Sequence, residues 1–125
     1  MSAESRISVT VTPTYLPEHS EPAAGRHAHA YEVQIVNRGT VGARLLSRHW
    51  ILTEADGRVS EVRGEGVVGE QPWLAPGEAY SYRSGAVFQT PVGTMHGSYT
   101  FVDDAGMRFD VEIPRFVLAL PRTLH

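Results

Sequence analysis

Three glycines near the middle of the chain, Gly64, Gly66 and Gly69, have the G-x-G-x-x-G spacing of a phosphate-binding loop. In a dinucleotide-binding fold this loop joins a strand to a helix, and the free N–H groups of the helix hold the pyrophosphate. Here Pro72 and Pro76 follow the loop. Prolines this close together prevent a helix from beginning there, because each lacks a donor and clashes with the preceding turn. The context therefore argues against a dinucleotide site.

The charges around these glycines also argue against a phosphate-binding site. Glu65 and Glu70 place negative charge where an anion would lie. A protein-kinase glycine loop joins two strands, but that chemistry requires a lysine and the chain has none. Arg63 and the loop N–H groups could still form an anion nest. We interpret Gly64–Gly69 as a wide, irregular connector that crosses between sheets, with binding of a polyphosphate nucleotide or another anion as the alternative.

Two histidines, His27 and His29, are spaced i, i+2, which places both rings on one face of a strand. Such a pair could supply two ligands to a divalent metal, although a tetrahedral site needs two more. The chain contains no cysteine, no H-x-x-x-H and no H-E-x-x-H. The alternative is that both rings are partly buried at one end of the fold. No metal ligand set is predicted.

Candidate catalytic residues do not form a recognised pattern. Ser47 and His49 are two residues apart, which is not a nucleophile elbow, and no G-x-S-x-G occurs. Asp103 and Asp104 lie in a "DDAG" segment that is typical of a hairpin turn. We therefore predict no catalytic residue, no cofactor and no enzymatic activity.

Length and composition narrow the class further. The 125 residues, of which 42% are apolar, suit one domain over 1–125 with a single core. The net charge of −3 gives no basis for binding nucleic acid or an anionic membrane. No apolar stretch is long enough to span a membrane, and the first residues lack the apolar region of a signal peptide. These features predict a soluble, cytoplasmic protein.

Alternation of apolar and polar residues dominates the chain and predicts strands. Pro13 interrupts one such strand, which is typical of a strand at the edge of a sheet. Turn signals recur every ~8–12 residues between the apolar runs, without a convincing helix. We predict an antiparallel β-sandwich of seven to eight strands, immunoglobulin-like or fibronectin III-like, with a closed barrel as the alternative. The clearest alternation is that of Tyr31, Val33, Ile35, Phe109, Val111 and Ile113.

The segment from Ala43 to Gly57 is predicted to be a strand that ends in a hairpin turn. Leu46, Trp50 and Leu52 would share one face, but Arg48 falls between them. Either a bulge near Ser47 shifts the alternation, or an arginine faces a groove. The pattern leaves both open, and Trp50 is predicted to fill the core.

Several blocks of this sequence resemble the bacterial ApaG (CorD) family over almost the whole chain. They are "SRHW", "VRGEGVVGEQP", "LAPGE", "SGAVFQTPVGTMHGSY" and "IPRFVLALP". The resemblance implies a fibronectin III-like sandwich without established enzymatic activity, and an association with cobalt resistance and magnesium efflux. It also implies a gene neighbourhood with a diadenosine tetraphosphate hydrolase, and related domains in eukaryotic F-box proteins and a polymerase-interacting protein that look like protein-binding modules. "GEGVVG" then becomes a family signature.

Our leading hypothesis is a non-enzymatic interaction domain with an unidentified protein partner. Its surface would combine the Arg63–Glu70 loop with the segment Ser84–His96. Binding of a polyphosphate nucleotide at Gly64–Gly69, or of a divalent metal through His27 and His29, are the alternatives. The loop residues are Arg63, Gly64, Glu65, Gly66, Val67, Val68, Gly69 and Glu70.

Overall fold

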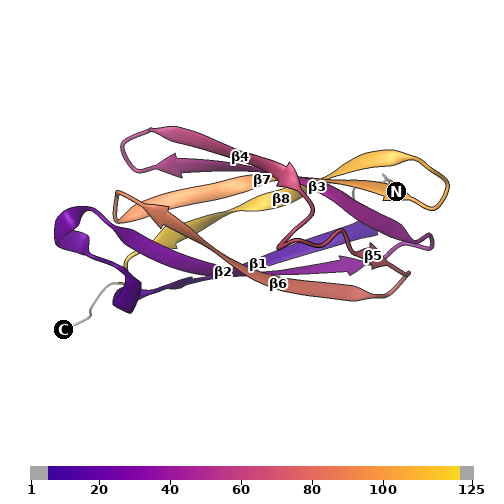
Figure 1. Cartoon of the computed structure of the whole chain (residues 1–125), viewed down its shortest axis with the longest axis horizontal. Helices are drawn as coiled ribbons and strands as arrows, with labels where there is room; N and C mark the ends of the chain where they lie inside the picture. The colour runs from indigo at the N-terminus through magenta and orange to yellow at the C-terminus, as the bar shows by residue number, and fades with distance from the viewer. Residues whose placement is uncertain (1–5, 122–125) are drawn as a thin grey trace.

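The computed structural model of the chain describes residues 6–121, which form a sandwich of two antiparallel sheets (Figure 1). In chain order the elements are β1 (Ile7–Tyr15), η2 (Pro17–His19), η3 (Pro22–Ala24), β2 (His27–Asn37), β3 (Ala43–Glu54), β4 (Val59–Glu65), β5 (Trp73–Leu74), β6 (Ala79–Phe88), β7 (Val92–Asp103) and β8 (Arg108–Ala119). The elements η2 and η3 are single 3₁₀ turns. The predicted all-β sandwich of seven to eight strands is confirmed.

No helix within residues 6–121 has the length and the apolar character needed to cross a membrane. Residues 1–5, which carry part of the sequence argument against a leader peptide, lie outside the described residues.

The two sheets leave one long side of the sandwich open. The smaller sheet has the order β1-β2-β6, and the larger has the order β4-β3-β7-β8, with β5 also paired to β3 (Figure 1). β1 is an edge strand, as Pro13 predicted. β1 and β8 contact each other and close one side. The opposite side therefore lies between β6 and the β4 edge.

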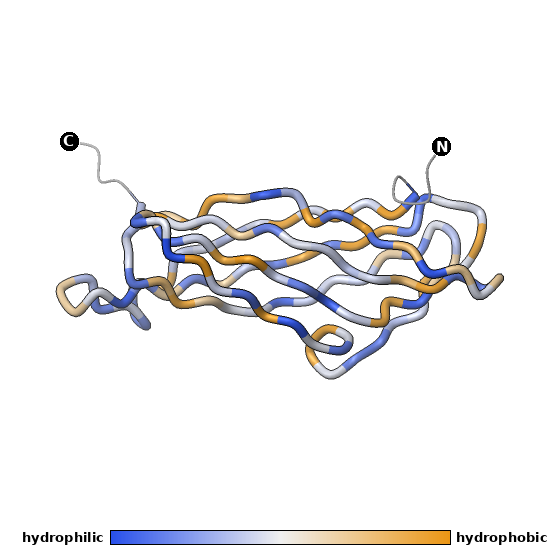
Figure 2. Tube along the Cα trace, turned by 90° about the horizontal axis from the view of Figure 1, so that it is seen from above, coloured by the Kyte–Doolittle hydropathy of each residue, from blue (hydrophilic) through white to orange (hydrophobic). Residues whose placement is uncertain are grey.

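The core lies between the sheets, where hydropathy alternates along the strands (Figure 2). Trp50 is 2% exposed and packs edge-on against the rings of Tyr31, Tyr99 and Phe116, so its predicted place in the core is confirmed. The apolar residues with no exposed surface among residues 6–121 are Val33, Ile35, Ala43, Leu45, Tyr99, Phe101, Ile113 and Leu118.

A bulge in β3 determines which side chains of this strand face the core. The register with β7 shifts between Leu45 and Ser47, so Leu46 is the extra residue. Leu45 takes the core position, and Leu46, predicted to share the face of Trp50, is only half-buried. After the bulge Arg48 lies on the same face as Trp50. The bulge and the groove-facing arginine, which the sequence left as alternatives, therefore occur together: the bulge lies at Leu46, and Arg48 faces a pocket between the sheets.

Asn37 ties together the turns at one end of the sandwich. Its side chain is fully buried, and its Nδ2 donates hydrogen bonds of 3.0 Å to the carbonyls of Val41 and Leu74. Its Oδ1 accepts from the N–H of Gly39, and its own N–H donates to the carbonyl of Glu78. All its polar groups are thus satisfied, which removes the free-energy cost of burying an amide.

Candidate functional site

The glycine segment contains a tight two-residue turn. The N–H of Val67 donates to the carbonyl of Glu70 at 2.8 Å, and the N–H of Glu70 donates back to Val67 at 2.9 Å. Between them Val68 has φ 43° and Gly69 has φ 83°. Two successive positive φ values under such a pair of bonds define a type I′ turn. The turn is compact and regular, so the predicted wide and irregular connector is wrong.

The connection also stays on one sheet. Gly64 lies within β4, and the N–H of Gly66 extends the pairing with β3 by donating to the carbonyl of Leu46. Beyond the turn, β5 pairs with β3 again. The chain crosses to the other sheet only after β5, before β6 begins. The predicted crossing within Gly64–Gly69 is therefore wrong, because pairing resumes on both sides of the turn.

Gly64 allows an arginine to lie flat across β4. It is the register partner of Arg48, and a Cβ at Gly64 would lie 2.7 Å from the guanidinium carbon. Nη1 of Arg48 donates hydrogen bonds of 2.9 Å to the carbonyls of Glu65 and Gly66. The guanidinium thus fixes the end of β4 at the start of the turn.

A pocket of about 220 Å³ opens between the sheets beside this turn. Among residues 6–121, Arg48 makes no ion pair. The hydroxyl of Tyr82 forms a hydrogen bond with that of Tyr99 in the buried interior. The pocket is lined by Tyr31, Arg48, Trp50, Val67, Val68, Tyr82 and Ser84. It combines one cation with hydroxyl groups and an apolar rim.

Burial keeps the tyrosines of this region neutral. Burial raises the pKa of Tyr31, Tyr82 and Tyr99 above the ordinary value of about 10. The positive charge of Arg48 opposes the rise in each case. The hydroxyls therefore remain hydrogen-bond donors at neutral pH.

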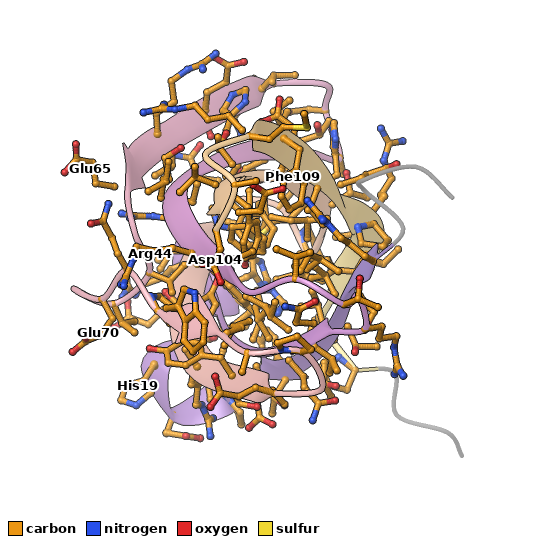
Figure 3. The ribbon with its side chains drawn as sticks, turned by 90° about the vertical axis from the view of Figure 1, so that its right-hand side faces the viewer. His19, Arg44, Glu65, Glu70, Asp104 and Phe109 are labelled. Carbon is orange, nitrogen blue, oxygen red and sulfur yellow. The ribbon has the colours of Figure 1, made fainter. Side chains whose placement is uncertain are left out.

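The predicted loop residues divide between two faces. Val67 is 1% exposed and lines the pocket, whereas Val68, at the tip of the turn, is 58% exposed. Arg63 and Glu65 lie on the outer face of the larger sheet. The side chains of Glu65 and Glu70 point away from the body of the molecule (Figure 3). The structure therefore brings Val67 and Val68 to the pocket and places Gly64 against Arg48, but it brings neither Arg63 nor the two glutamates there.

The predicted companion segment, Ser84–His96, meets the turn at one end only. Ser84 lines the same pocket as Val67. The segment then runs to Gln89 and Thr90, whose N–H groups donate to the carboxylate of Glu54 at the end of β3. Of the Ser84–His96 segment, Ser84 is the residue that lines the pocket beside the turn.

The anion nest predicted for the glycine loop has few donors left. The N–H groups of Gly66, Val67 and Glu70 all donate to carbonyls of the chain. They are therefore not available to a phosphate, and the glycines serve the turn and the close approach of Arg48.

The two predicted metal-ligand candidates are buried. His27 is 3% exposed and His29 is 2% exposed. The ring of His29 packs edge-on against Tyr15 and Phe88, while Nδ1 of His27 lies 3.4 Å from the Tyr15 hydroxyl. Within the described part of the chain, no three His, Cys, Asp or Glu side chains gather as metal ligands. Packing at the end of the sandwich accounts for the pair.

A shallow depression of about 470 Å³ lies on the outer face of the larger sheet. Ser47 and His49 line it, and Oγ1 of Thr100 donates to Asp110 at 2.7 Å. Nε2 of His49 lies 3.5 Å from the Glu61 carboxylate. The Ser47–His49 pair is thus part of an open polar sheet face.

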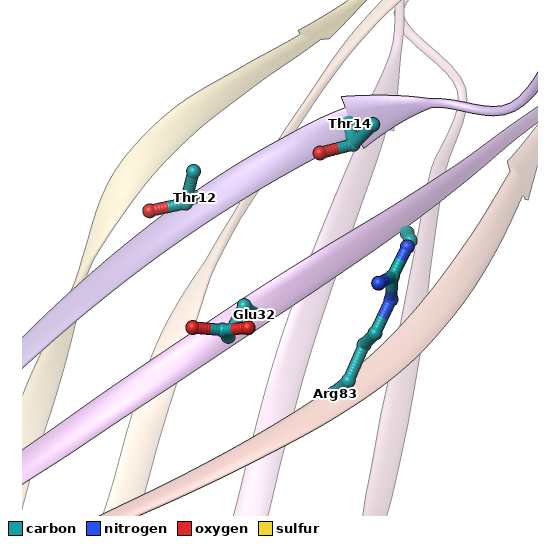
Figure 4. A pocket seen from close by; sticks show the side chains of 5 residues that line it. Thr12, Thr14, Glu32 and Arg83 are labelled. Atoms are coloured by element: carbon teal, nitrogen blue, oxygen red, sulfur yellow. The ribbon is translucent and has the colours of Figure 1, made fainter.

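A smaller hollow of about 140 Å³ lies on the outer face of the other sheet (Figure 4). Thr12, Thr14 and Ala30 line it together with Glu32 and Arg83, which are register partners on β2 and β6. Because these opposite charges face each other, they give the hollow little net potential for a charged ligand.

Comparisons with known proteins match nearly the whole chain. A family model described as the ApaG domain matches residues 17–103. The chain is 57% identical over 120 residues to Protein ApaG of Thiobacillus denitrificans, covering 96% of this chain and 94% of that protein. Protein ApaG of Pseudomonas paraeruginosa is 55% identical over 120 residues, covering 96% and 95%. A crystal structure from Bordetella pertussis, described as an ApaA protein, superposes with a TM-score of 0.91 at 51% identity, covering 94% of this chain and 95% of that chain.

Proposed function

Because this chain belongs to the ApaG family, we propose that it is a non-enzymatic protein-interaction domain that contacts its partner on the open side of the sandwich. The contact surface, called here the open-side surface, consists of the Val67–Glu70 turn, the pocket beside it and the adjoining edge of β6. The observation that carries the proposal is the conformation of Val68.

Val68 adopts a backbone conformation that β-branched residues rarely adopt. Its φ is 43°, and 58% of its surface is exposed to solvent. Strained residues of this kind persist where the surrounding structure holds them, and they are concentrated at functional sites. Here the paired bonds of the turn and the buried Val67 side chain hold Val68 outward. A fixed, exposed apolar side chain at a loop tip favours a contact with another protein.

Further apolar groups lie along the same edge of the larger sheet. Val62 faces the same way as its register partner Trp50, yet it is 44% exposed because the smaller sheet ends at β6. Trp73 in β5 is also 44% exposed, on the outer face of this edge, and its Nε1 donates to Asp104 at 2.8 Å. Within residues 6–121 no strand pairs with the outer edge of β6, and such an edge can accept an extended strand. These features fit an extended segment of a partner.

We propose that the effect on cobalt resistance and magnesium efflux associated with the family arises through the bound partner, and that the interaction takes place in the cytoplasm.

A photo-crosslinking amino acid at position 68, in the native cell, tests the proposal. The matched control is the same substitution at Val117 in β8, which is 56% exposed on another part of the surface. We expect a discrete protein adduct from position 68 that position 117 does not form. Equal adducts at both positions, or none at position 68, would overturn the proposal.

A further inference from the structure

We propose that the pocket between the sheets binds a single carboxylate, presented by an aspartate or glutamate side chain in the extended partner segment. This inference rests on the proposed function, because it assigns the chemistry that the open-side surface recognises. Its central residue is Arg48.

The guanidinium of Arg48 is positioned but not neutralised. Its Nη1 is held by the carbonyls of Glu65 and Gly66, and one of its faces lies against Gly64. Among residues 6–121, neither Nε nor Nη2 has a hydrogen-bond partner or a carboxylate neighbour. Nε and Nη2 form the side-on edge of an arginine, whose two parallel N–H groups match a carboxylate. Since the side chain is already fixed, little conformational entropy is lost when this edge binds.

The groups around Arg48 add hydrogen-bond donors for an anion. Tyr82 and Ser84 bring hydroxyl groups to the same pocket, and the hydroxyls of the tyrosines remain protonated because burial raises their pKa. The half-enclosed position between two sheets strengthens the attraction between Arg48 and an anion relative to bulk water. The volume of about 220 Å³ suits one acidic side chain better than a nucleotide.

The remaining charges favour a carboxylate over a phosphate. Glu65 and Glu70 lie outside the pocket, exposed and pointing away from it (Figure 3). Solvent screens their repulsion of one negative charge, but the repulsion grows with the charge of the ligand. The chain as a whole is also negative, at −3. A peptide strand paired with β6 would hold its acidic side chain between the sheets. Free acetate and phosphate lack the backbone hydrogen bonds of such a strand, so we expect them to bind more weakly.

The test is an NMR titration of the ¹⁵N-labelled full chain with two capped peptides at millimolar concentration, acetyl-Thr-Val-Glu-Val-Thr-amide and its Gln counterpart. We expect the Glu peptide to shift amides of β6 and of the Gly66–Val67 segment, and to bind about tenfold more tightly than the Gln peptide, a difference of about 1.4 kcal/mol. Arg48→Met should remove this preference. Ser84→Ala, which leaves Arg48 in place, should weaken Glu-peptide binding a few-fold without altering the fold.

Three outcomes would overturn the inference: equal binding of the two peptides, no shifts with either peptide, or stronger binding of inorganic phosphate than of the Glu peptide at the same residues. The proposed function fails separately. A position-68 adduct that persists unchanged in Arg48→Met would keep the interaction surface and refute the carboxylate site. If position 68 forms no specific adduct in the chain that retains Arg48, the proposed interaction surface itself is refuted.

Discussion

Gly64 and Arg48 are register partners across the β3–β4 pair, and the guanidinium of Arg48 occupies the space that a side chain at position 64 would fill. The first glycine of the G-x-G-x-x-G pattern is therefore explained by an arginine within the chain rather than by a phosphate. This relationship links the glycine segment to the pocket, because the same arginine holds the start of the turn.

Replacing Gly64 with alanine should displace Arg48. The new Cβ would lie 2.7 Å from the guanidinium carbon, so the side chain must move and lose its bonds to Glu65 and Gly66. We expect a net stability loss of about 1–2 kcal/mol, because a lost hydrogen bond from a charged group costs about 1.5–3 kcal/mol and alanine in a strand recovers about 0.5–1 kcal/mol relative to glycine. Urea unfolding and the ¹H–¹⁵N shift of the Arg48 Nε–H group would measure both effects. Ser60→Ala, on the same strand, is the control; an unmoved Arg48 resonance in Gly64→Ala would contradict the prediction.

The other two glycines of the pattern should differ in their tolerance of a side chain. Gly66 has φ 62°, and a Cβ there would collide with the backbone carbonyl oxygen of Glu70. Gly69 has φ 83°, but a Cβ at this position would have no neighbouring atom within 4 Å. We expect Gly66→Ala to cost about 2 kcal/mol or more and Gly69→Ala about 1 kcal/mol, the latter from backbone strain alone. Matched thermal or urea unfolding curves test this; equal losses would exclude the collision as the cause.

The buried tyrosines should make the fold sensitive to alkali. The pKa values of Tyr31, Tyr82 and Tyr99 are raised in the folded chain, first of all by burial. Above about pH 10 the unfolded chain releases these protons while the folded chain retains them, so stability is complete below that pH and falls above it. Each such tyrosine contributes a slope of at most about 1.4 kcal/mol per pH unit.

The double variant Tyr82→Phe/Tyr99→Phe tests the source of this slope, because it removes both partners of the buried hydroxyl pair together. Urea unfolding between about pH 9 and 11.5 should show a slope smaller by up to about 2.7 kcal/mol per pH unit than in the parent chain. An unchanged slope would assign the alkaline loss to other groups.

His29 should make the fold sensitive to mild acid. Burial lowers its pKa, and the charge of His27 lowers it further. Below about pH 6.5 the unfolded chain binds the proton more readily than the folded one, so stability is complete above that pH and falls as pH drops through the folded-state pKa. His29→Phe, which keeps a ring against Phe88, should flatten the stability curve below about pH 6.5. His19→Gln, at an exposed position, should leave the curve unchanged; a flattening there instead would refute the assignment.

Most strands were predictable because apolar and polar side chains alternate along them. In Phe109, Val111 and Ile113 every second residue is apolar, and all three are buried. Pro13 likewise marked an edge strand correctly, because proline has no backbone N–H to donate to a neighbouring strand and is therefore tolerated at the edge of a sheet. Where an extra residue breaks the period, as at Leu46, the face of each later side chain depends on a pairing partner that is distant in the sequence. Local periodicity could therefore report the conflict at Arg48 but not resolve it.

The candidate site was predictable only in part, since it is assembled from β3, β6 and the turn. The glycine segment was recognisable by its spacing, yet its turn uses Val68 and Gly69 rather than a familiar Asn-Gly pair. Tyr82 and Ser84 carry no signal of their own. Only the pairing of β6 with β2 and the packing of the two sheets bring them to Arg48.

Asn37 has a consequence for how the molecule opens. Its hydrogen bonds connect the β2–β3 turn with β5 and with the start of β6, so none of these segments can detach without breaking the others' bonds. Amide protons of these segments should therefore exchange with solvent as one cooperative unit, at rates close to those of global unfolding. At the opposite end the carboxylate of Glu54 accepts from the N–H groups of Gln89 and Thr90, and Nε2 of His29 is buried without a partner among the described residues. Because the Glu54 bonds are partly exposed to solvent whereas Asn37 is fully buried, breathing motions should begin at the Glu54 end, which leaves the two ends of one sandwich with different lifetimes.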